Sequence, residues 1–322
     1  MAEKILVNAL YKHLIKEEYY PDILFLDNKQ CDGAGDGSDL SEIEMAVMQP
    51  FYFNKTFMDK MPGLRIAQIT GAGYDRVDID EVKKRGITLC NSRGVMSVSI
   101  AEDVFCKMLF ISREVRTVEE DKRMHHWDGV SKGQDQWMCT CYQDLFGKTL
   151  GIMGYGSIGR EISKRAKAFG MKIHVYDAFE QTDPNIDRCF IGEDKLEGFL
   201  PTCDYIVVSI PLNEKTKHII DDRAFWLMKE SAVLINVARG PLVDTEALIH
   251  ALRSGMIRAA AVDVYESEPL PPTSPLWEID NLFMSSHKAG MGDTWKGFIG
   301  ALIMRNIDNY KEGRTLENII PL

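Results

Sequence analysis

The sequence predicts an α/β protein with two doubly wound domains, each built on a parallel sheet. Short apolar runs alternate with helical patterns along nearly all of its 322 residues, which is typical of parallel strands joined by crossover helices. The length suits two domains of about 100–200 residues each. Hydrophobic residues make up 45% and charged residues 27% of the chain, the balance of an ordinary globular protein.

The first hundred residues contain five candidate strands. They are Lys4–Ala9, Asp22–Asp27, Met45–Gln49, Leu64–Thr70 and Thr88–Asn91. Between the last two, Asp80–Gly86 has acids at its start, bases near its end and a glycine at the stop, which predicts a helix. This block therefore predicts a small five-stranded α/β domain.

A second series of strands follows a polar stretch around Glu119–Gln143. Its candidates are Thr149–Met153, Lys172–Asp177, Tyr205–Ile210, Ala232–Ala238, Ala259–Tyr265 and Leu282–His287. Six strands with intervening helices are the number in a full dinucleotide-binding sheet. The series predicts a second, larger domain.

Two predicted helices, Ser97–Ser112 and Gly297–Tyr310, flank the second series. Helices that cross between the domains would explain both positions. We therefore expect residues 1–96 and 291–322 to form a first domain, and residues 97–290 to form a second domain that binds the cofactor.

Charge and hydropathy argue against two classes of partner. The formal net charge is −10 and no basic stripe is visible, so a nucleic-acid partner is not expected. Apolar runs such as Ala232–Ala238 are far shorter than the roughly 20 residues that span a bilayer. The first residues also make a poor signal peptide, because an acid and a base precede any apolar stretch.

The seven cysteines are odd in number and scattered along the chain. Reduced thiols in the cytoplasm fit this usage better than a disulfide framework. Cys139 and Cys141 form the one close pair, and no second Cys/His pair stands at metal-ligand spacing. The sequence therefore predicts no metal site.

A glycine-rich turn stands between the first strand of the second series and the next helix. Gly154, Gly156 and Gly159 give the pattern G-x-G-x-x-G, which permits a tight turn, close approach of a pyrophosphate and close helix packing. Asp177 ends the following strand at the spacing of a ribose-binding carboxylate. A structural turn with a surface aspartate is the alternative. Because Asp177 repels a 2′-phosphate and no base follows it, NAD is predicted over NADP.

Three chemically apt side chains follow later strands of this series. They are Arg239, Glu268 and His287, and ligands bind beyond the carboxyl ends of such strands. An arginine can hold a carboxylate with two hydrogen bonds. A histidine can exchange a proton near neutral pH, and a neighbouring acid keeps it charged and oriented. This set predicts hydride exchange between NAD and a small 2-oxo or 2-hydroxy acid.

The chain resembles the D-2-hydroxyacid dehydrogenase family over nearly its whole length. The segments that carry the resemblance are Gly71–Asp78, Asn91–Val95, Ala101–Glu102, Gly147–Gly156, Asn236–Gly240, Asp263–Tyr265, Glu268–Pro269 and His287. The resemblance implies a Rossmann cofactor domain beside a smaller, flavodoxin-like substrate domain. It also implies specificity for the D isomer and a homodimer formed through the cofactor domain.

The resemblance also implies individual roles. Arg239 would bind the substrate carboxylate, and His287 would be the acid/base residue paired with Glu268. Ala72 and Gly73 would offer backbone N–H groups to the substrate from the first domain. Further residues would contact the cofactor: Ser157 and Ile158 at the pyrophosphate, Asp263 at the nicotinamide carboxamide, and Ile210, Val237 and Ala238 along its flanks.

One departure from the family follows the histidine. Lys288 stands where many relatives carry an apolar residue, and it could act on His287 or bind a second anionic group of the substrate. The sequence leaves both readings open.

The main alternative is an NAD-sensing binding protein of the corepressor type on the same fold. The lack of basic or partner-docking segments counts against it. Formate dehydrogenases share the fold but resemble a site with glutamine near the histidine, so Glu268 counts against that activity. A methyltransferase of Rossmann type would lack His287.

Overall fold

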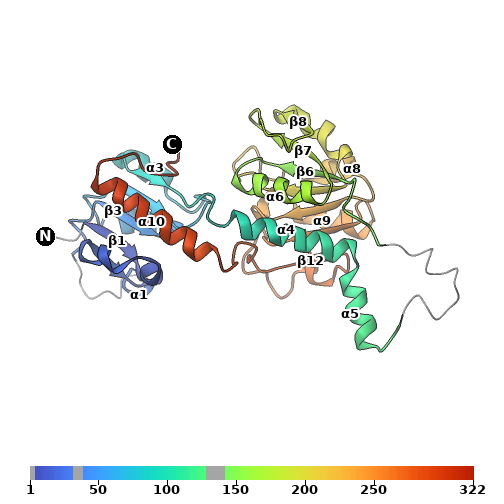
Figure 1. Cartoon of the computed structure of the whole chain (residues 1–322), viewed down its shortest axis with the longest axis horizontal. Helices are drawn as coiled ribbons and strands as arrows, with labels where there is room; N and C mark the ends of the chain where they lie inside the picture. Colours follow the sequence, from blue (N-terminus) through green and yellow to red (C-terminus); the bar gives the residue numbers. More distant parts are fainter. Residues whose placement is uncertain (1–3, 32–38, 128–141) are drawn as a thin grey trace. The chain divides into compact units, whose positions relative to one another are not determined.

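The computed structural model describes residues 4–31, 39–127 and 142–322. The chain divides into two compact units (Figure 1). Unit 1 consists of Met1–Met96 and Gly292–Leu322, and unit 2 consists of Ser97–Met291. Unit 1 contains a five-stranded sheet and unit 2 a seven-stranded sheet.

The sheet of unit 1 has the strand order β2-β1-β3-β4-β5, the order of flavodoxin-like folds. Its strands are β1 (Ile5–Asn8), β2 (Ile23–Leu26), β3 (Met45–Met48), β4 (Ile66–Ile69) and β5 (Thr88–Cys90). All of these pairs are parallel. The helices before the crossing to unit 2 are α1 (Asn28–Cys31), α2 (Lys55–Met58) and α3 (Ile79–Arg85). The predicted five-stranded parallel domain is confirmed.

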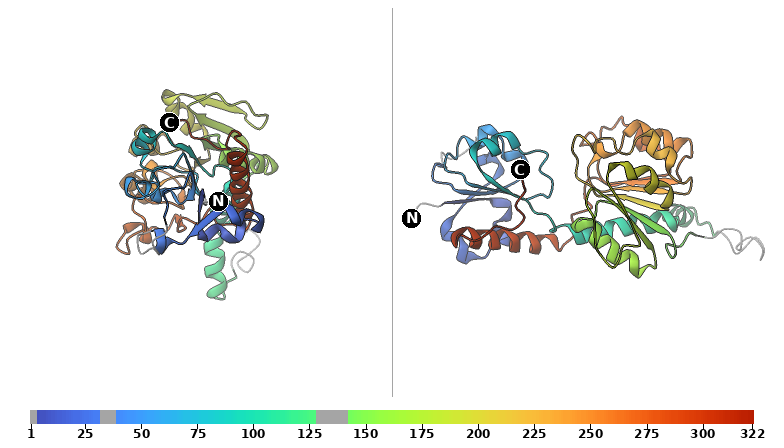
Figure 2. Two further views of the ribbon diagram at one scale, coloured as in Figure 1. Left: turned by 90° about the vertical axis from the view of Figure 1, so that its left-hand side faces the viewer. Right: turned by 90° about the horizontal axis from the view of Figure 1, so that it is seen from above.

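Helix α10 (Trp295–Lys311) completes unit 1 from the far end of the chain. Its buried residues Ile299 and Ile303 pack in one cluster with Ile5 and Val7 of β1. The right-hand view of Figure 2 shows the helix lying along one face of the sheet. The predicted helix Gly297–Tyr310 thus forms, and its apolar face closes the core of the small sheet.

The sheet of unit 2 has the order β12-β11-β10-β9-β6-β7-β8, with every pair parallel. Its strands are β6 (Thr149–Met153), β7 (Lys172–Asp177), β8 (Arg188–Ile191), β9 (Tyr205–Val208), β10 (Val233–Asn236), β11 (Ala259–Val262) and β12 (Leu282–Met284). This is the Rossmann order, with one strand added beyond its usual six. The predicted count of six was wrong because edge strand β8 exposes Arg188 and Ile191 and lacks the apolar run of a buried strand.

Helices cover both faces of the larger sheet. The helices of unit 2 are α4 (Ser97–Ser112), α5 (Val115–Arg123), α6 (Ser157–Ala168), α7 (Leu196–Phe199), α8 (Asp222–Leu227) and α9 (Thr245–Arg253). Side chains of α4 and α6 share one core cluster, and those of α8 and α9 share another. Figure 2 shows the sheet between these two layers.

Four strands of unit 2 end earlier than predicted, and the first of them, β9, stops at Val208 instead of Ile210. Strand β10 stops at Asn236, β11 at Val262 and β12 at Met284. The apolar residues that follow, such as Val237 and Val264, are buried by loop packing instead of strand pairing. The shorter strands leave longer loops at the carboxyl edge, and these loops carry the candidate site.

The stretch around Glu119–Gln143 was predicted as polar, without assigned structure. Its start belongs to helix α5, which has no buried residue. Cys139 and Cys141 lie outside the described residues. None of the described helices combines the length and the apolar character that a membrane crossing requires.

Candidate active site

The glycine-rich turn joins β6 to α6 and admits no side chain at two of its glycines. Gly154 has a φ of +90°, and a Cβ there would lie 2.9 Å from the carbonyl oxygen of Ser209. A Cβ on Gly159 would lie 2.4 Å from the carbonyl oxygen of Gly154. Gly156 is exposed, and a Cβ on it would meet nothing within 4 Å. The turn is therefore tightly packed on the protein side and open on the side of Gly156.

Helix α6 begins at this open side. Its N-cap is Gly156, no side chain caps its first turn, and that turn holds no acidic residue. Ser157 and Ile158 thus present their backbone N–H groups at the positive end of a helix, the usual binding site for phosphate groups. These residues fit the pyrophosphate of a dinucleotide.

Asp177 ends β7 beside the glycine turn. One carboxylate oxygen accepts a hydrogen bond from the Tyr155 N–H at 2.8 Å, and the other accepts one from the Phe179 N–H at 3.0 Å. Each oxygen of a carboxylate can accept a second hydrogen bond. The carboxylate is therefore anchored next to the turn and keeps the capacity to bind ribose hydroxyls.

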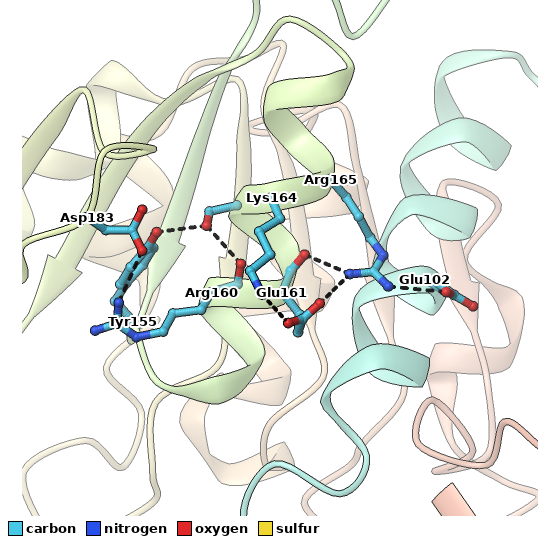
Figure 3. A network of polar contacts seen from close by, with 8 residues as sticks. Glu102, Tyr155, Arg160, Glu161, Lys164, Arg165 and Asp183 are labelled. Atoms are coloured by element: carbon cyan, nitrogen blue, oxygen red, sulfur yellow. Dashed lines mark hydrogen bonds and ion pairs between the residues drawn. The ribbon is translucent and has the colours of Figure 1, made fainter. Parts of the chain in front are cut away.

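A polar network holds α6 in place (Figure 3). The buried Tyr155 hydroxyl lies 2.7 Å from Oγ of Ser163, in the second turn of the helix, and burial raises the pKa of Tyr155. Arg165 contacts Glu161 on its own helix at 2.8 Å and Glu102 on α4 at 3.2 Å. These links connect the glycine turn to the body of unit 2.

The loops after β9 and β10 carry the next predicted residues. Ile210 and Val237 are buried, while Ala238 and Arg239 are half-buried. Buried Asn236 shapes the second loop: its amide donates to the Arg239 carbonyl at 2.9 Å and accepts from the Ala238 N–H at 3.1 Å. No role was predicted for Asn236 from the sequence, although the residue begins the Asn236–Gly240 motif.

Gly240 brings the Arg239 loop against the loop after β11. A Cβ on Gly240 would lie 1.9 Å from the carbonyl carbon of Tyr265 and 2.4 Å from the nitrogen of Glu266. A side chain at Gly240 would therefore force the two loops apart. The backbone after Arg239 thus packs directly on the segment that leads to Glu268.

His287 and Glu268 are in direct contact. Nδ1 of His287 lies 2.7 Å from Oε2 of Glu268. The second carboxylate oxygen of Glu268 accepts a hydrogen bond from the Tyr265 N–H at 3.0 Å, which fixes the carboxylate toward the imidazole. The His287 side chain is 50% exposed, so Nε2 can reach a ligand.

Asp263 holds the turn on which His287 lies. Its buried carboxylate accepts hydrogen bonds from Ser285 Oγ at 2.6 Å and from the N–H groups of Lys288 and Ala289 at 2.9 Å each. Its carbonyl oxygen accepts from the His287 N–H at 2.7 Å, where His287 has a φ of +52°. These contacts give Asp263 a role in shaping the turn, beside the carboxamide contact that the resemblance implies. Lys288 is exposed.

Tyr265 links the same turn to the loop after β11. Its hydroxyl donates to the Ser285 carbonyl at 2.8 Å. Burial, with smaller contributions from the charges of Asp263 and Glu268, raises the pKa of Tyr265 to about 12. The hydroxyl therefore stays protonated and available as a donor. No role was predicted from the sequence for Tyr265 or Ser285, because each acts only through contacts that folding creates.

Ala72 and Gly73 belong to unit 1, in the loop after β4. Asn91 donates to the Ala72 carbonyl at 2.8 Å, and the Ser92 N–H donates to the Gly71 carbonyl at 2.9 Å. These bonds hold the loop from the neighbouring segment after β5. Ala72 is exposed, so its backbone can reach a ligand.

Comparison with known proteins identifies the family. Residues 105–289 match the family described as D-isomer specific 2-hydroxyacid dehydrogenase, NAD binding domain. The chain is 34% identical over 261 residues to a glyoxylate reductase from Korarchaeum cryptofilum (strain OPF8), covering 80% of this chain and 76% of that protein.

Solved structures agree over the whole chain. A D-isomer specific 2-hydroxyacid dehydrogenase family protein from Aeromonas salmonicida subsp. salmonicida A449 is similar with a TM-score of 0.83 and 28% identity, covering 99% of each chain. A D-isomer specific 2-hydroxyacid dehydrogenase from Xanthobacter autotrophicus Py2, solved with NADPH and MES, has a TM-score of 0.82 and 26% identity, covering 99% of this chain and 98% of that one. Nothing in these comparisons supports the alternative of an NAD-sensing corepressor. The chain belongs to the D-isomer specific 2-hydroxyacid dehydrogenases, and it is an NAD-dependent enzyme that interconverts 2-oxo acids and 2-hydroxy acids.

Proposed function

We propose that Arg239, His287 and Glu268 carry out the reduction of a short 2-oxo acid to the D-2-hydroxy acid. The observation that supports this most is the 2.7 Å contact between His287 Nδ1 and Glu268. It lies at the carboxyl edge of the dinucleotide-binding sheet, in loops packed on the one that carries Arg239. A cation, an acid/base group and its orienting carboxylate are what this reaction requires of a protein.

Each residue has one task in this proposal. Arg239 binds the substrate carboxylate with two parallel hydrogen bonds and orients the 2-oxo group. Glu268 engages Nδ1 of His287 and stabilises the imidazolium. Nε2 of His287 then donates its proton to the oxo oxygen, which would otherwise carry a negative charge in the product. The nicotinamide, when bound in its reduced form, supplies the hydride that C2 receives.

The substrate is a small acid, and glyoxylate is the first candidate because a relative named glyoxylate reductase is 34% identical. The test is loss of NADH absorbance with a panel of 2-oxo acids that differ in side-chain size and charge, run in both directions. Turnover of at least one member is expected, and Arg239→Ala should raise KM for it. Tight NADH binding without turnover of any member would contradict the proposal and favour a sensor.

We infer that NAD is preferred over NADP. The anchored carboxylate of Asp177 suits ribose hydroxyls and repels a 2′-phosphate. Arg160, the first base after the glycine turn, contacts Asp183 at 3.1 Å (Figure 3) and Gln181 at 3.0 Å, so its guanidinium is already held by these two side chains. The Xanthobacter relative was solved with NADPH, so kcat/KM should be measured with both cofactors. Equal values would contradict this preference.

We propose a homodimer formed through unit 2. Helix α5 has no buried residue, and Val118, Met124 and Trp127 on it and beside it are exposed. Such side chains gain stability when a partner covers them. Analytical ultracentrifugation should give twice the chain mass of 36.5 kDa, and Trp127→Glu should shift the protein toward the monomer.

We propose that the enzyme works in the cytoplasm. Cys90, Cys106, Cys189 and Cys203 are thiols outside any disulfide, which is usual for proteins of a reducing compartment. Fractionation of cells that produce the protein tests this directly. Recovery in a secreted or membrane fraction would contradict it.

A further inference from the structure

The proposed reaction requires three neighbouring loops of unit 2 to keep fixed positions relative to one another. They follow β9, β10 and β11, and they carry Ile210, Arg239 and Glu268. We infer that His218, in the first of these loops, is a positioning residue that ties all three together. This inference rests on the proposed roles of Glu268 and His287.

The backbone of His218 binds the Arg239 loop. Its N–H donates to the Pro241 carbonyl at 2.8 Å, and His218 takes a left-handed conformation with a φ of +51°. Two residues later, Ile220 donates to the Leu242 carbonyl at 3.1 Å and accepts from the Asp244 N–H at 2.9 Å. The β9 and β10 loops are thus paired like a short parallel strand directly after Arg239.

The imidazole of His218 extends this link to the third loop. Nε2 lies 2.9 Å from Oε1 of Glu266, and Nδ1 lies 3.6 Å from Oδ2 of Asp244. Asp244 is itself fixed, because it caps α9 by accepting from the N–H groups of Glu246 and Ala247. Both ring nitrogens therefore face carboxylates, one on an anchored helix cap and one on the loop that leads to Glu268.

A displacement of Glu266 would also displace Glu268, because one backbone contact separates the two residues. Glu266 follows Tyr265, whose N–H donates to the Glu268 carboxylate at 3.0 Å. The same backbone packs on Gly240, next to Arg239. Loss of the His218 contact would let this segment move away from Gly240, and a misplacement of about 1 Å can reduce a reaction rate by about 10²-fold.

The first test is His218→Ala in the full-length enzyme, with the best substrate of the 2-oxo acid panel. We expect kcat/KM for the oxo acid to fall about tenfold, which is less than a full 1 Å misplacement would cause. Direct binding of NADH should fall less than kcat/KM does, because the expected pyrophosphate and ribose contacts lie on the glycine turn and Asp177, outside these loops. Most of the loss should appear in kcat and little in KM, since a displaced Glu268 misorients His287 while Arg239 still binds the oxo acid.

Two further variants separate positioning from general damage. His218→Gln keeps a donor that can reach Glu266 and should recover part of the lost rate. Glu266→Gln should resemble His218→Ala, and the double variant should be no slower than the slower single variant. If His218→Ala does not fold, His218→Gln and Glu266→Gln decide the matter through the same division of the loss between kcat and KM.

His250→Ala is the matched control. His250 also contacts an aspartate, with Nδ1 3.2 Å from Asp222, but this exposed pair joins α9 to the start of α8 and involves neither Asp244 nor Glu266. Its kinetics should equal those of wild type. Wild-type kcat and KM in both His218→Ala and His218→Gln would overturn the inference. So would a double variant in which the effects of His218→Ala and Glu266→Gln multiply independently. Full activity of Glu268→Gln and His287→Ala would instead overturn the proposed function.

Discussion

Two histidines of unit 2 contact acids that stand two residues apart in one loop, yet they suit different tasks. His287 contacts Glu268 and His218 contacts Glu266, and both histidines have a positive φ. His287 engages one carboxylate through Nδ1 and exposes half of its side chain. His218 has carboxylates at both nitrogens and is 37% exposed.

The difference shows what distinguishes a histidine that exchanges protons from one that only links two segments of the chain. An imidazole that exchanges protons needs one nitrogen held by an orienting acid and the other open to substrate. An imidazole with both nitrogens directed at carboxylates can hold two segments together but has no nitrogen left for a ligand. The chemical environment of each ring, more than the presence of a His–Glu pair, assigns its role.

The largest expected effect is on His287. His287→Ala should lower kcat by about 10²–10⁴-fold, the range for loss of a general acid, against about tenfold for His218→Ala. Steady-state kinetics with the best oxo acid measures both. Similar losses in the two variants would break the comparison, because they would give the two histidines equal weight in the chemistry.

The contact behind Arg239 comes next. Gly240→Ala should lower kcat/KM by about 100-fold, because its Cβ would overlap the Tyr265 backbone and shift Arg239 against Glu268. Overpacking should also lower the free energy of unfolding by about 1–3 kcal/mol. Gly297→Ala is the control, since a Cβ there meets nothing within 4 Å. Wild-type kinetics in Gly240→Ala would mean that the spacing of these loops does not limit the reaction.

Replacing the two acids separates their tasks. Glu268→Gln should lower kcat about 10- to 100-fold, a smaller loss than removing the general acid itself. A neutral glutamine holds the imidazole less firmly than the carboxylate does, because hydrogen bonds to charged groups are stronger. Glu266→Gln should lower kcat less than Glu268→Gln does. Wild-type kcat in Glu268→Gln would contradict the proposed pairing.

The smallest expected effect is that of removing the Tyr265 hydroxyl, which stabilises the turn that carries His287. Tyr265→Phe removes the donor to the Ser285 carbonyl and should lower kcat about threefold. The unpaired carbonyl should reduce the free energy of unfolding by about 1–3 kcal/mol. Thermal unfolding and kinetics of the variant test this, and a faster enzyme would show that the link restrains the turn unfavourably.

The sequence predicted elements whose signal is local. A characteristic spacing in the sequence marks the glycine turn, the series of strands and the three strand-end residues. Strand β8 and helix α5 leave weak patterns, because an edge strand and an unpacked helix bury little apolar surface. His218 left none: its partners Asp244 and Glu266 lie 26 and 48 residues away, and only folding brings them together.

The order of the two units along the chain has a consequence for synthesis. Unit 2 is one continuous segment, Ser97–Met291, inserted into unit 1, whose core needs Ile299 and Ile303 of α10. During translation, unit 2 is synthesised in full before that helix. One apolar face of the N-terminal sheet therefore stays uncovered until α10 has been made. We therefore expect the middle of the chain to fold first during translation, contrary to the usual N-terminal-first order. Because their apolar side chains stay exposed until then, strands β1 and β3 would be the segments that most need a chaperone.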